Sequence, residues 1–280
     1  MKKIKKGDKV VRKSYGKDVI FKVTNIIKDE KIAILNGVIE RIKADSPIDD
    51  LELVNEKEVK KVIRYHEKEI EKRLIKSKLL KEDRNYKIGI ITKNNKAKEK
   101  IITGKILHLD GDRRYSEKSY RYYQKLGLRA IVKNIPEYRQ PKIVYKLLNE
   151  YKPDILVITG HDGLIKREGG YHDIYNYRNS QYFIETVREA RKYEKETNSK
   201  LVIFAGACQS YFEAIISAGA NFASSPARIL IDFLDPLIVA EKVAITEKYK
   251  FITIDDIAHE LRDGRDGVGG VGSFGTMKRE

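Results

Sequence analysis

The first 55 residues alternate between apolar and polar positions in short runs, a pattern typical of β-strands on a half-buried surface. The alternating runs are residues 9–12, 19–27, 31–35, 38–42 and 51–54. Turn-forming residues separate the runs, and the Asn36-Gly37 pair predicts a hairpin that joins strands at 31–35 and 38–42. Five short strands in so few residues predict a small β-barrel over residues 1–55.

Residues 56–85, which follow this expected SH3-like barrel, have apolar positions at helical spacing among many charged ones. The apolar positions are Val59, Val62, Ile63, Ile70, Leu74 and Leu79. Spacing of this kind places apolar side chains on one face of a helix. The segment is therefore predicted to be a basic amphipathic linker helix.

From residue 86 the pattern becomes an alternation of buried-type strands and amphipathic helices. Strands are predicted at 105–109, 129–135, 154–159 and 200–205, with a further candidate at 242–246. Helices are predicted at 116–126, 141–151, 180–197 and 211–218. Such alternation predicts an α/β domain over residues 86–280, with a mostly parallel sheet covered by helices on both faces. In sheets of this type the ligand site lies beyond the carboxyl ends of the strands.

The chain has 280 residues, of which 41% are hydrophobic, enough for a small domain joined to a larger one. Charged residues make up 35%, and the formal net charge is +16. Half of this excess lies within residues 56–100, which favours a solvated helical face over a nucleic-acid groove. The rival function is a non-catalytic protein that docks on acidic polymers or nucleic acid through its basic N-terminal region.

Cys208 is the only cysteine, so an intramolecular disulfide is excluded. No apolar segment follows the basic N-terminus, and no apolar run has the ~20 residues that cross a bilayer. We therefore expect neither a signal peptide nor a membrane partner. The chain is expected to act in a reducing cytoplasm, where the thiol stays free.

The carboxyl ends of three predicted strands carry the residues with catalytic chemistry. They are Asp110-Gly111-Asp112, Gly160-His161-Asp162-Gly163 and Gly206-Ala207-Cys208-Gln209-Ser210. Parallel strands end at the same edge of a sheet, so His161 and Cys208 are expected to be neighbours although they are far apart in the sequence.

A thiol and an imidazole at one sheet edge are the pair that covalent catalysis by cysteine requires. The thiol needs a partner that takes its proton, and imidazole does this best near pH 7. The tetrahedral intermediate needs backbone N–H donors, which a glycine-containing turn beside the histidine supplies. We predict Cys208 as the nucleophile and His161 as the base. The acyl substrate is a peptide or, in a further alternative, a non-peptide ester or amide.

The runs around His161 and Cys208 resemble those of the caspase-like cysteine peptidases of clan CD, over roughly residues 104–250. The resemblance implies a Cys–His dyad that needs no third member. Those peptidases usually have glycine directly after the histidine, where this chain has Asp162. The implied oxyanion donors are the backbone N–H of Gly163 or of Asp162, together with that of Cys208. The Asp162 side chain is expected to cap the following backbone rather than to orient His161.

A closer resemblance, to the YabG sporulation protease family, covers nearly the whole chain. It rests on the His161 and Cys208 runs, on residues 221–226 and 262–270, and on the basic N-terminal region. The resemblance implies a sporulation-specific endopeptidase of endospore-forming bacteria that acts in the mother cell. Its implied substrates are spore coat and related proteins, cut after arginine, and it implies a capacity for self-cleavage.

A pocket that selects arginine requires a carboxylate, because guanidinium pairs best with an acid in two-point contact. Asp110 and Asp112 follow the first strand of the α/β domain and are the candidate substrate-binding residues. Their alternative role is to cap the helix that begins near Ser116, and both interpretations stay open. Asp232 and Asp235, in a later loop, are further candidates.

Neither a metal nor another cofactor is expected, because the His, Cys and carboxylate residues show no metal-ligand spacing. His108 is expected to pack within a strand, His172 to lie in a loop near the site, and His259 to be solvated. The glycine-rich residues 267–272 lack the helix that follows a phosphate-binding loop. They are expected to form a flexible lid or to become ordered around substrate. The sequence leaves the oligomeric state open.

Overall fold

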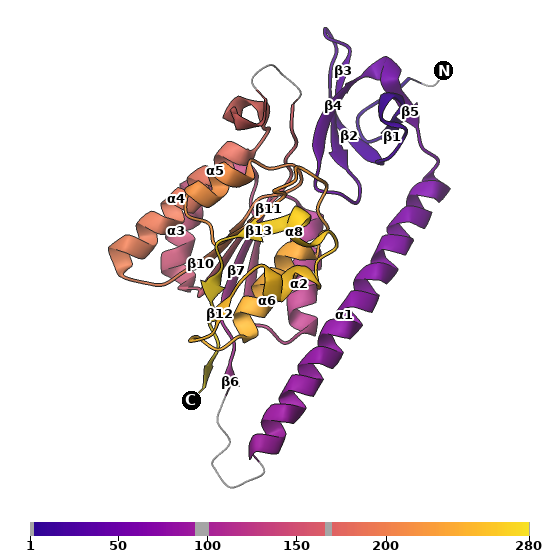
Figure 1. The fold of residues 1–280 in the computed structure, drawn as a ribbon. Coiled ribbons are helices and arrows are strands. Elements are labelled where there is room, and N and C mark those ends of the chain that lie inside the picture. The colour runs from indigo at the N-terminus through magenta and orange to yellow at the C-terminus, as the bar shows by residue number, and fades with distance from the viewer. Residues whose placement is uncertain (1–2, 93–100, 166–169, 280) are drawn as a thin grey trace.

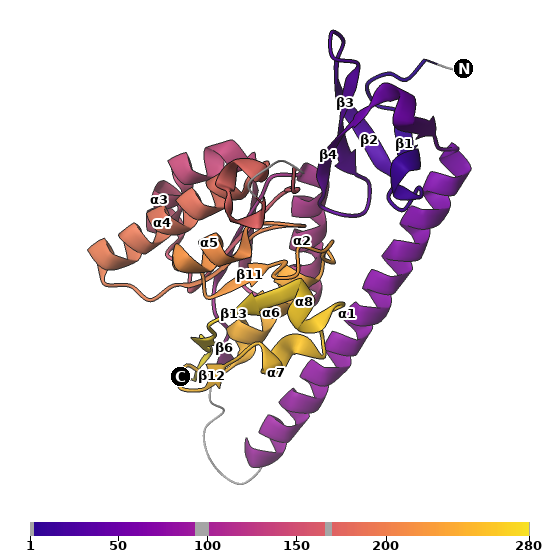
Figure 2. The same cartoon turned by 45° about the horizontal axis from the view of Figure 1, so that its top comes forward.

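The computed structural model describes residues 3–92, 101–165 and 170–279, with the side chains of residues 76–92 left out. An N-terminal β-domain, a long helix and an α/β domain follow one another along the chain (Figure 1). Helix α1 (Glu56–Thr92) leaves the β-domain and runs along the outside of the α/β domain in both views (Figures 1 and 2).

The N-terminal β-domain is one antiparallel sheet with the strand order β4-β3-β2-β1-β5. The strands are β1 (Lys9–Arg12), β2 (Phe21–Ile27), β3 (Ile32–Gly37), β4 (Lys43–Pro47) and β5 (Leu51–Leu53). Apolar side chains such as those of Val10, Phe21 and Leu35 are fully buried in its core. This confirms the predicted antiparallel β-domain ahead of the helix.

The hairpin between β3 and β4 differs from the prediction, because residues 38–42 form a loop rather than a strand. The two strands pair as far as Asn36 and Lys43, so the chain turns beyond the expected Asn-Gly position. Ile42 is buried; its carbonyl accepts a hydrogen bond of 2.8 Å from the N–H of Gly37 in β3, and Ile42 also forms a bridge with Asp162 of the α/β domain. The apolar residues that predicted a strand are therefore buried by the other domain. We call residues 38–42 the strap.

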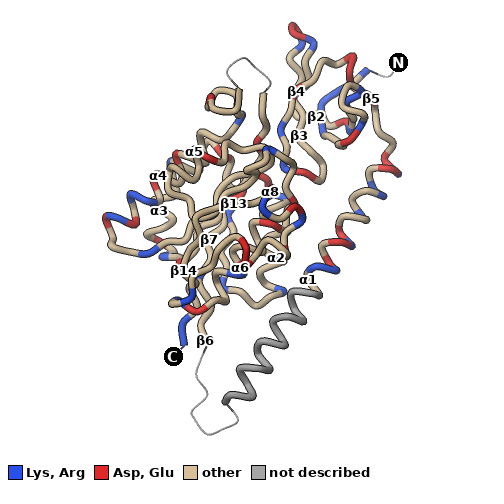
Figure 3. Tube along the Cα trace, viewed as in Figure 1, with Lys and Arg blue, Asp and Glu red and all other residues tan. Residues whose placement is uncertain are grey.

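Helix α1 confirms the predicted helix and extends it to Thr92. Basic and acidic residues alternate along its described part (Figure 3). Lys72 and Glu69, one turn apart, form an ion pair of 2.7 Å. Val59 and Leu74 on its inner side are buried, which is the expected amphipathic arrangement.

The α/β domain is built on a six-stranded sheet with the order β13-β11-β10-β9-β7-β8. The strands are β7 (Ile106–Asp110), β8 (Ala130–Asn134), β9 (Ile155–Thr159), β10 (Val202–Ala205), β11 (Phe222–Ser224) and β13 (Val268–Gly270). All pairs are parallel except that of β11 with β13. The predicted mostly parallel α/β sheet is confirmed.

Helices cover both faces of this sheet (Figure 2). One core contains residues of α2 (Arg113–Lys125) and α6 (Asp235–Ile245), and the other contains residues of α3 (Gln140–Tyr151), α4 (Ser180–Thr197) and α5 (Phe212–Ser217). The strands between them are buried on both sides, as the β9 side chains show by being at most 1% exposed.

Two predictions for the C-terminal part were wrong. Residues 242–246 are not a strand, because most of them belong to α6. The buried apolar run of α6 is long, and it is not bounded by the turn residues that flank a short strand. Residues 268–270 form β13 at the edge of the sheet rather than a lid. Short glycine-rich segments pair with a strand when tertiary contacts hold them there, and no local pattern predicts this.

The remaining elements are short. They are β6 (Ile101–Ile102), β12 (Phe251–Ile252), β14 (Ser273–Phe274), β15 (Lys278–Arg279), α7 (Asp255–Ala258) and α8 (Gly264–Gly267), with 3₁₀ turns at Lys13–Tyr15, Ile48–Asp50, Glu137–Arg139, Gly170–His172 and Ile174–Asn176. Among the described residues, no helix has the length and apolar character needed to cross a membrane.

Candidate active site

The register of two neighbouring strands brings His161 and Cys208 to one edge of the sheet. In the parallel pair β9 and β10, Ile158 lies opposite Ala205. His161 and Cys208 each follow their paired residue by three positions in the chain, so both lie in turns beyond the carboxyl edge. Both are buried, with His161 3% and Cys208 0% exposed. The predicted neighbouring positions at one sheet edge follow from this register.

Asp162 fastens the histidine turn to the elements around it. Its carboxylate accepts hydrogen bonds from the backbone N–H groups of Gly163 at 2.9 Å and Asn179 at 2.8 Å. It also accepts from the hydroxyls of Ser180 and Ser210, and Ser210 belongs to the cysteine turn. The predicted capping role of Asp162 is confirmed, and the same side chain joins the two turns that carry the candidate dyad.

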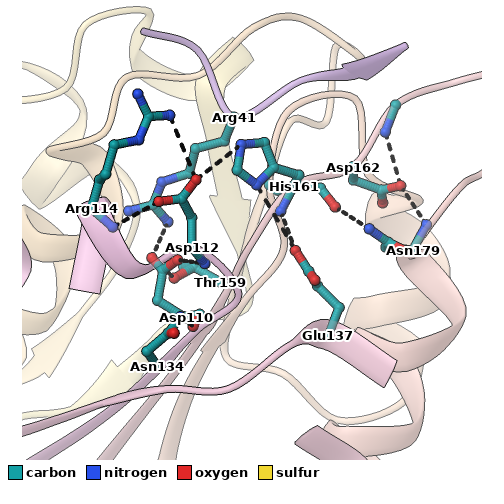
Figure 4. Close-up of polar contacts among 12 residues, drawn as sticks. Arg41, Asp110, Asp112, Arg114, Asn134, Glu137, Thr159, His161, Asp162 and Asn179 are labelled. Carbon is teal, nitrogen blue, oxygen red and sulfur yellow. Dashed lines mark hydrogen bonds and ion pairs between the residues drawn. The ribbon is translucent and has the colours of Figure 1, made fainter. Parts of the chain in front are cut away.

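The imidazole of His161 lies between two carboxylates (Figure 4). Nε2 is 3.9 Å from Asp112 Oδ2, and Nδ1 is 4.0 Å from Glu137 Oε1. Burial lowers the pKa of His161 to about 4, although the Asp112 carboxylate acts to raise it. The imidazole is therefore neutral at pH 7 and able to accept a proton.

Glu137 is a site residue that the sequence analysis missed. Its Oε1 accepts a 2.7 Å hydrogen bond from the backbone N–H of His161. A Cβ atom at Gly111 or Gly160 would stand 2.2 or 2.4 Å from this carboxylate, so both glycines make room for it. The glycines were visible in the sequence, but nothing local connected them with a glutamate on a different loop.

The Cys208 thiol lies in the contact between the two domains. It belongs to the same apolar cluster as Phe21, Leu35 and Ile42 of the N-terminal β-domain. Sγ accepts a hydrogen bond of 3.4 Å from the backbone N–H of Ile231. Burial raises the pKa of Cys208 to about 12, although backbone N–H groups of Ile231 and of the strap favour the thiolate. The thiol is therefore protonated at neutral pH in this closed arrangement.

Asp110 is fully buried at the end of β7 and faces a cation from the N-terminal β-domain. Nη1 of Arg41, a strap residue, lies 3.1 Å from Asp110 Oδ2 (Figure 4). Thr159 donates a hydrogen bond of 2.8 Å to the same oxygen, and His108 lies buried beside it. Burial raises the pKa of Asp110, and the Arg41 guanidinium opposes this. Asp110 thus pairs with a guanidinium from the N-terminal β-domain, and His108 packs in the core as predicted.

Asp112 has the capping role that the sequence offered as one of two alternatives, and it also faces His161. Its Oδ1 caps α2 by accepting from the backbone N–H of Arg114 at 2.7 Å, while Oδ2 faces His161. Burial acts to raise the pKa of Asp112, but His161 and Arg114 hold it below its usual value. Asp232 and Asp235 instead accept hydrogen bonds near the start of α6. Asp232 Oδ1 accepts from the backbone N–H of Leu234, and Asp235 Oδ2 accepts from the backbone N–H of Asp232.

The two candidate oxyanion donors of the histidine turn have different partners. The N–H of Gly163 donates to the Asp162 carboxylate, whereas the N–H of Asp162 donates to the Arg41 carbonyl at 3.2 Å. A backbone N–H that donates to the carbonyl oxygen of a neighbouring segment points in the direction that an oxyanion donor requires. This geometry favours the N–H of Asp162 over that of Gly163.

The sequence of the whole chain matches one family model, YabG peptidase U57, over residues 5–280. The chain belongs to the YabG peptidase family. It is 40% identical over 260 residues to the sporulation-specific protease YabG of Bacillus subtilis (strain 168), covering 90% of this chain and 88% of that protein.

The solved structures add no functional argument for this YabG peptidase. The receiver domain of the histidine kinase CKI1 from Arabidopsis thaliana, complexed with Mg²⁺, aligns with a TM-score of 0.27 and 17% identity. The alignment covers 42% of this chain and 79% of that one. Similarity at this level is too low to support any conclusion.

The histidines outside the site have no catalytic partners in this YabG peptidase. The backbone carbonyl of His172 accepts a hydrogen bond from the Tyr211 hydroxyl, and His259 is 69% exposed beside Glu260. Across the described residues, no cluster of three or more His, Cys, Asp or Glu side chains is arranged to hold a metal ion.

Proposed function

We propose that this sporulation protease is a cysteine endopeptidase with Cys208 as its nucleophile and His161 as its base. The observation that carries the proposal is the strand register, because His161 and Cys208 follow paired residues of two neighbouring parallel strands by the same number of positions. Asp162 supports it by joining the two turns through Ser210. A neutral imidazole and a protonated thiol are the starting pair for proton transfer followed by attack.

In the proposed reaction, the Cys208 thiolate attacks the carbonyl carbon of the substrate after His161 has taken the thiol proton. The oxyanion is held by the backbone N–H of Cys208 and that of Asp162, or of Gly163 if the turn rearranges. His161 then delivers the proton to the leaving amine. Water hydrolyses the thioester and restores the thiol. No cofactor takes part.

The proposed preference for arginine rests on Asp110. A buried carboxylate without a cation is costly, so a pocket with Asp110 at its base favours a substrate that brings a guanidinium. Asp112 adds a second negative charge near the pocket and the dyad. The proposed substrates are spore coat and related proteins in the mother cell, together with the chain itself.

The test combines thiol labelling with peptide cleavage. An arginine chloromethylketone should add its mass at Cys208, and an arginine-containing peptide should be cut on the carboxyl side of arginine. Cys208→Ala and His161→Ala should each reduce cleavage by on the order of 10³-fold or more while the circular dichroism spectrum is unchanged. The matched control His259→Ala, at an exposed histidine, should retain activity. Full activity in Cys208→Ala would overturn the proposal.

A further inference from the structure

The strap runs beside the histidine turn of the α/β domain and forms backbone hydrogen bonds with it. The backbone N–H of Lys43 donates to the Asp162 carbonyl at 2.8 Å, and the N–H of Asp162 donates to the Arg41 carbonyl at 3.2 Å. Ile42, between the two, forms a parallel bridge with Asp162. Peptides bind many proteins in this way, by pairing their backbone with an open strand. The strap therefore has the backbone contacts of a bound peptide.

The side chain of Arg41 fills the pocket that contains Asp110. Figure 4 shows it reaching from the N-terminal β-domain to that carboxylate. Only 1% of Arg41 is exposed, and its guanidinium also packs 4.8 Å from the Tyr115 ring and 5.3 Å from the Phe233 ring. The Tyr115 hydroxyl donates to the carbonyl of Ile39 in the same strap. An aromatic wall and a buried acid are the features of a guanidinium site.

The side chain, the carbonyl oxygen and the backbone N–H of Arg41 each lie near a different part of the candidate catalytic site. The side chain meets the Asp110 carboxylate, and the carbonyl oxygen meets the candidate oxyanion donor of Asp162. The backbone N–H lies close enough to Cys208 to favour its thiolate. A substrate arginine before the cut would have to make these same contacts.

Two glycines make this docking possible. A Cβ atom at Gly163 would stand 2.1 Å from the Lys43 carbonyl oxygen, and one at Gly37 would stand 2.3 Å from the Glu40 carbonyl oxygen. Backbone cannot move away as a flexible side chain can, so any other residue at either position would displace the strap. Both sides of the contact are therefore shaped for it.

Stability alone does not explain why the strap buries an arginine here. Nε and Nη2 of Arg41 are buried, and within the described parts of the chain they have no hydrogen-bond partner. A buried ion pair with unsatisfied donors contributes little net stability compared with an apolar contact of the same size. A pocket built to receive guanidinium from substrates accounts for the pairing directly.

We propose that the strap is an internal substrate: it closes the site to other proteins, and the chain's own Cys208 cuts the Arg41–Ile42 bond. This inference rests on the proposed cysteine peptidase function and names its first bond. The strap links β3 to β4, so the cut leaves both strands paired in the N-terminal β-domain. The new chain ends are then free to leave the site, and other substrates gain access to Asp110.

The reaction balances with water as the only added reactant. Sγ of Cys208 bonds to the Arg41 carbonyl carbon while the thiol proton passes to His161. The carbon–nitrogen bond to Ile42 breaks, and His161 returns the proton to the Ile42 nitrogen. Water then cleaves the thioester, which leaves a carboxylate on Arg41 and regenerates the Cys208 thiol.

Mass spectrometry and N-terminal sequencing of the incubated full-length chain test the proposal. The wild-type chain should yield residues 1–41 and a second fragment that begins at Ile42. Cys208→Ala should yield neither. Arg41→Ala should lose this cut, whereas Lys43→Ala, a matched change of the next basic residue, should keep it at Ile42. The decisive readout is the wild-type fragment, so it does not depend on whether the Arg41 variant folds.

Mixing distinguishes a cut within one chain from a cut between chains. Arg41 is buried in its own pocket, so another molecule cannot reach it. In a mixture of wild-type chain and tagged Cys208→Ala chain, only the wild type should be cut at Ile42. The first-order rate constant of the Arg41–Ile42 cut should be the same when the total protein concentration is raised tenfold. Equal cutting of the tagged chain, or a first-order rate constant that rises with protein concentration, would overturn the inference.

An external arginine peptide separates failure of this inference from failure of the proposed function. If the wild type cuts the peptide, Cys208→Ala does not, and the Arg41–Ile42 bond stays intact in both, the internal substrate is disproved while the peptidase stands. If Cys208→Ala still cuts the peptide, the proposed nucleophile is wrong. Cutting of the wild-type chain only at bonds other than Arg41–Ile42 also overturns the inference.

Discussion

Asp110 and Asp162 are buried carboxylates at the carboxyl ends of neighbouring strands, but different kinds of partner surround them. Asp162 receives its hydrogen bonds from backbone N–H groups and serine hydroxyls of the α/β domain itself. Asp110 faces the guanidinium of Arg41, which belongs to a different domain. The partners of Asp162 belong to its own domain, and the cation beside Asp110 belongs to the other one.

This difference suggests a structural role for Asp162 and, in the proposed function, a ligand-binding role for Asp110. Burying a charge is tolerated only when partners offset the lost hydration. Asp162 has that compensation in every state of the protein, so it can hold the dyad turns in place. In the proposed function, Asp110 loses its cation when the strap leaves, and the site then favours a chain that supplies another guanidinium. Four changes, in order of decreasing effect, test whether this separation is real.

The largest expected effect is on stability, in Asp162→Ala. The variant leaves four buried donors without an acceptor, and each such group costs about 1–3 kcal/mol. We expect the free energy of unfolding, measured in urea, to fall by ~3 kcal/mol or more. The control is Asp173→Ala, which removes an acidic cap from a single exposed turn and should cost under ~1 kcal/mol. An equal loss in both variants would show that Asp162 is not a scaffold residue.

Asp110→Asn should act on specificity. Removing one member of a buried charge pair costs ~2–5 kcal/mol, so kcat/KM for a peptide with arginine before the cut should fall by about 100-fold. A peptide with a neutral residue at that position should be affected far less. Asp162→Asn should preserve the ratio between the two peptides. If Asp110→Asn left this ratio unchanged, the pocket would have to be assigned elsewhere.

A smaller effect is expected in the pH dependence of stability. Burial raises the pKa of Asp162 to about 6, above its ordinary value of 3.8, although its hydrogen bonds oppose this. The folded state therefore binds its proton more tightly than the unfolded state. This contribution to stability is complete below pH 3.8 and is lost as the pH rises through 6.

Urea unfolding of the wild type and of Asp162→Asn at pH 5 and pH 7.5 measures that contribution. The wild type should lose about 1 kcal/mol more than the variant between the two pH values. The asparagine does not titrate, so it removes this source of pH dependence. Identical pH dependence in the two proteins would mean that the Asp162 carboxyl is charged throughout.

The smallest effect is expected for Glu137→Gln. The glutamine still accepts from the His161 N–H, but it removes a charge 4.0 Å from Nδ1. The loss of on the order of 1 kcal/mol should lower kcat about fivefold with little change in KM, because the imidazolium forms only during the reaction. The control is Glu150→Gln, at an exposed position on α3. A change in KM alone would indicate a role in binding rather than in positioning His161.

The sequence predicted much of the α/β domain because its signals are local. Strand β9 reads as a short apolar run, and helix α4 begins and ends at the predicted residues 180 and 197. The positions of His161 and Cys208 followed, since parallel strands place their carboxyl ends at one edge. Glu137 did not follow, because its loop approaches His161 only after α3 has packed against the sheet.

The strap is a segment whose structure the sequence predicted wrongly. Its apolar residues and the preceding Asn36-Gly37 pair predicted a hairpin strand, and the structure has a loop docked on another domain. Period and turn signals describe what a segment prefers by itself. They carry no information about a partner surface that is more than a hundred residues away in the chain.

The amino-acid sequence alone determined the order of strands and helices from β7 to α5, the glycine-flanked His161 and Cys208, and the carboxylates at the end of β7. These depend on periodicity and on short-range spacing, which a linear chain displays directly. Only the tertiary structure decided that Arg41 pairs with Asp110 and that the strap covers Cys208. Burial and charge pairing across domains depend on three-dimensional contact, because a carboxylate takes whichever cation the fold brings within reach.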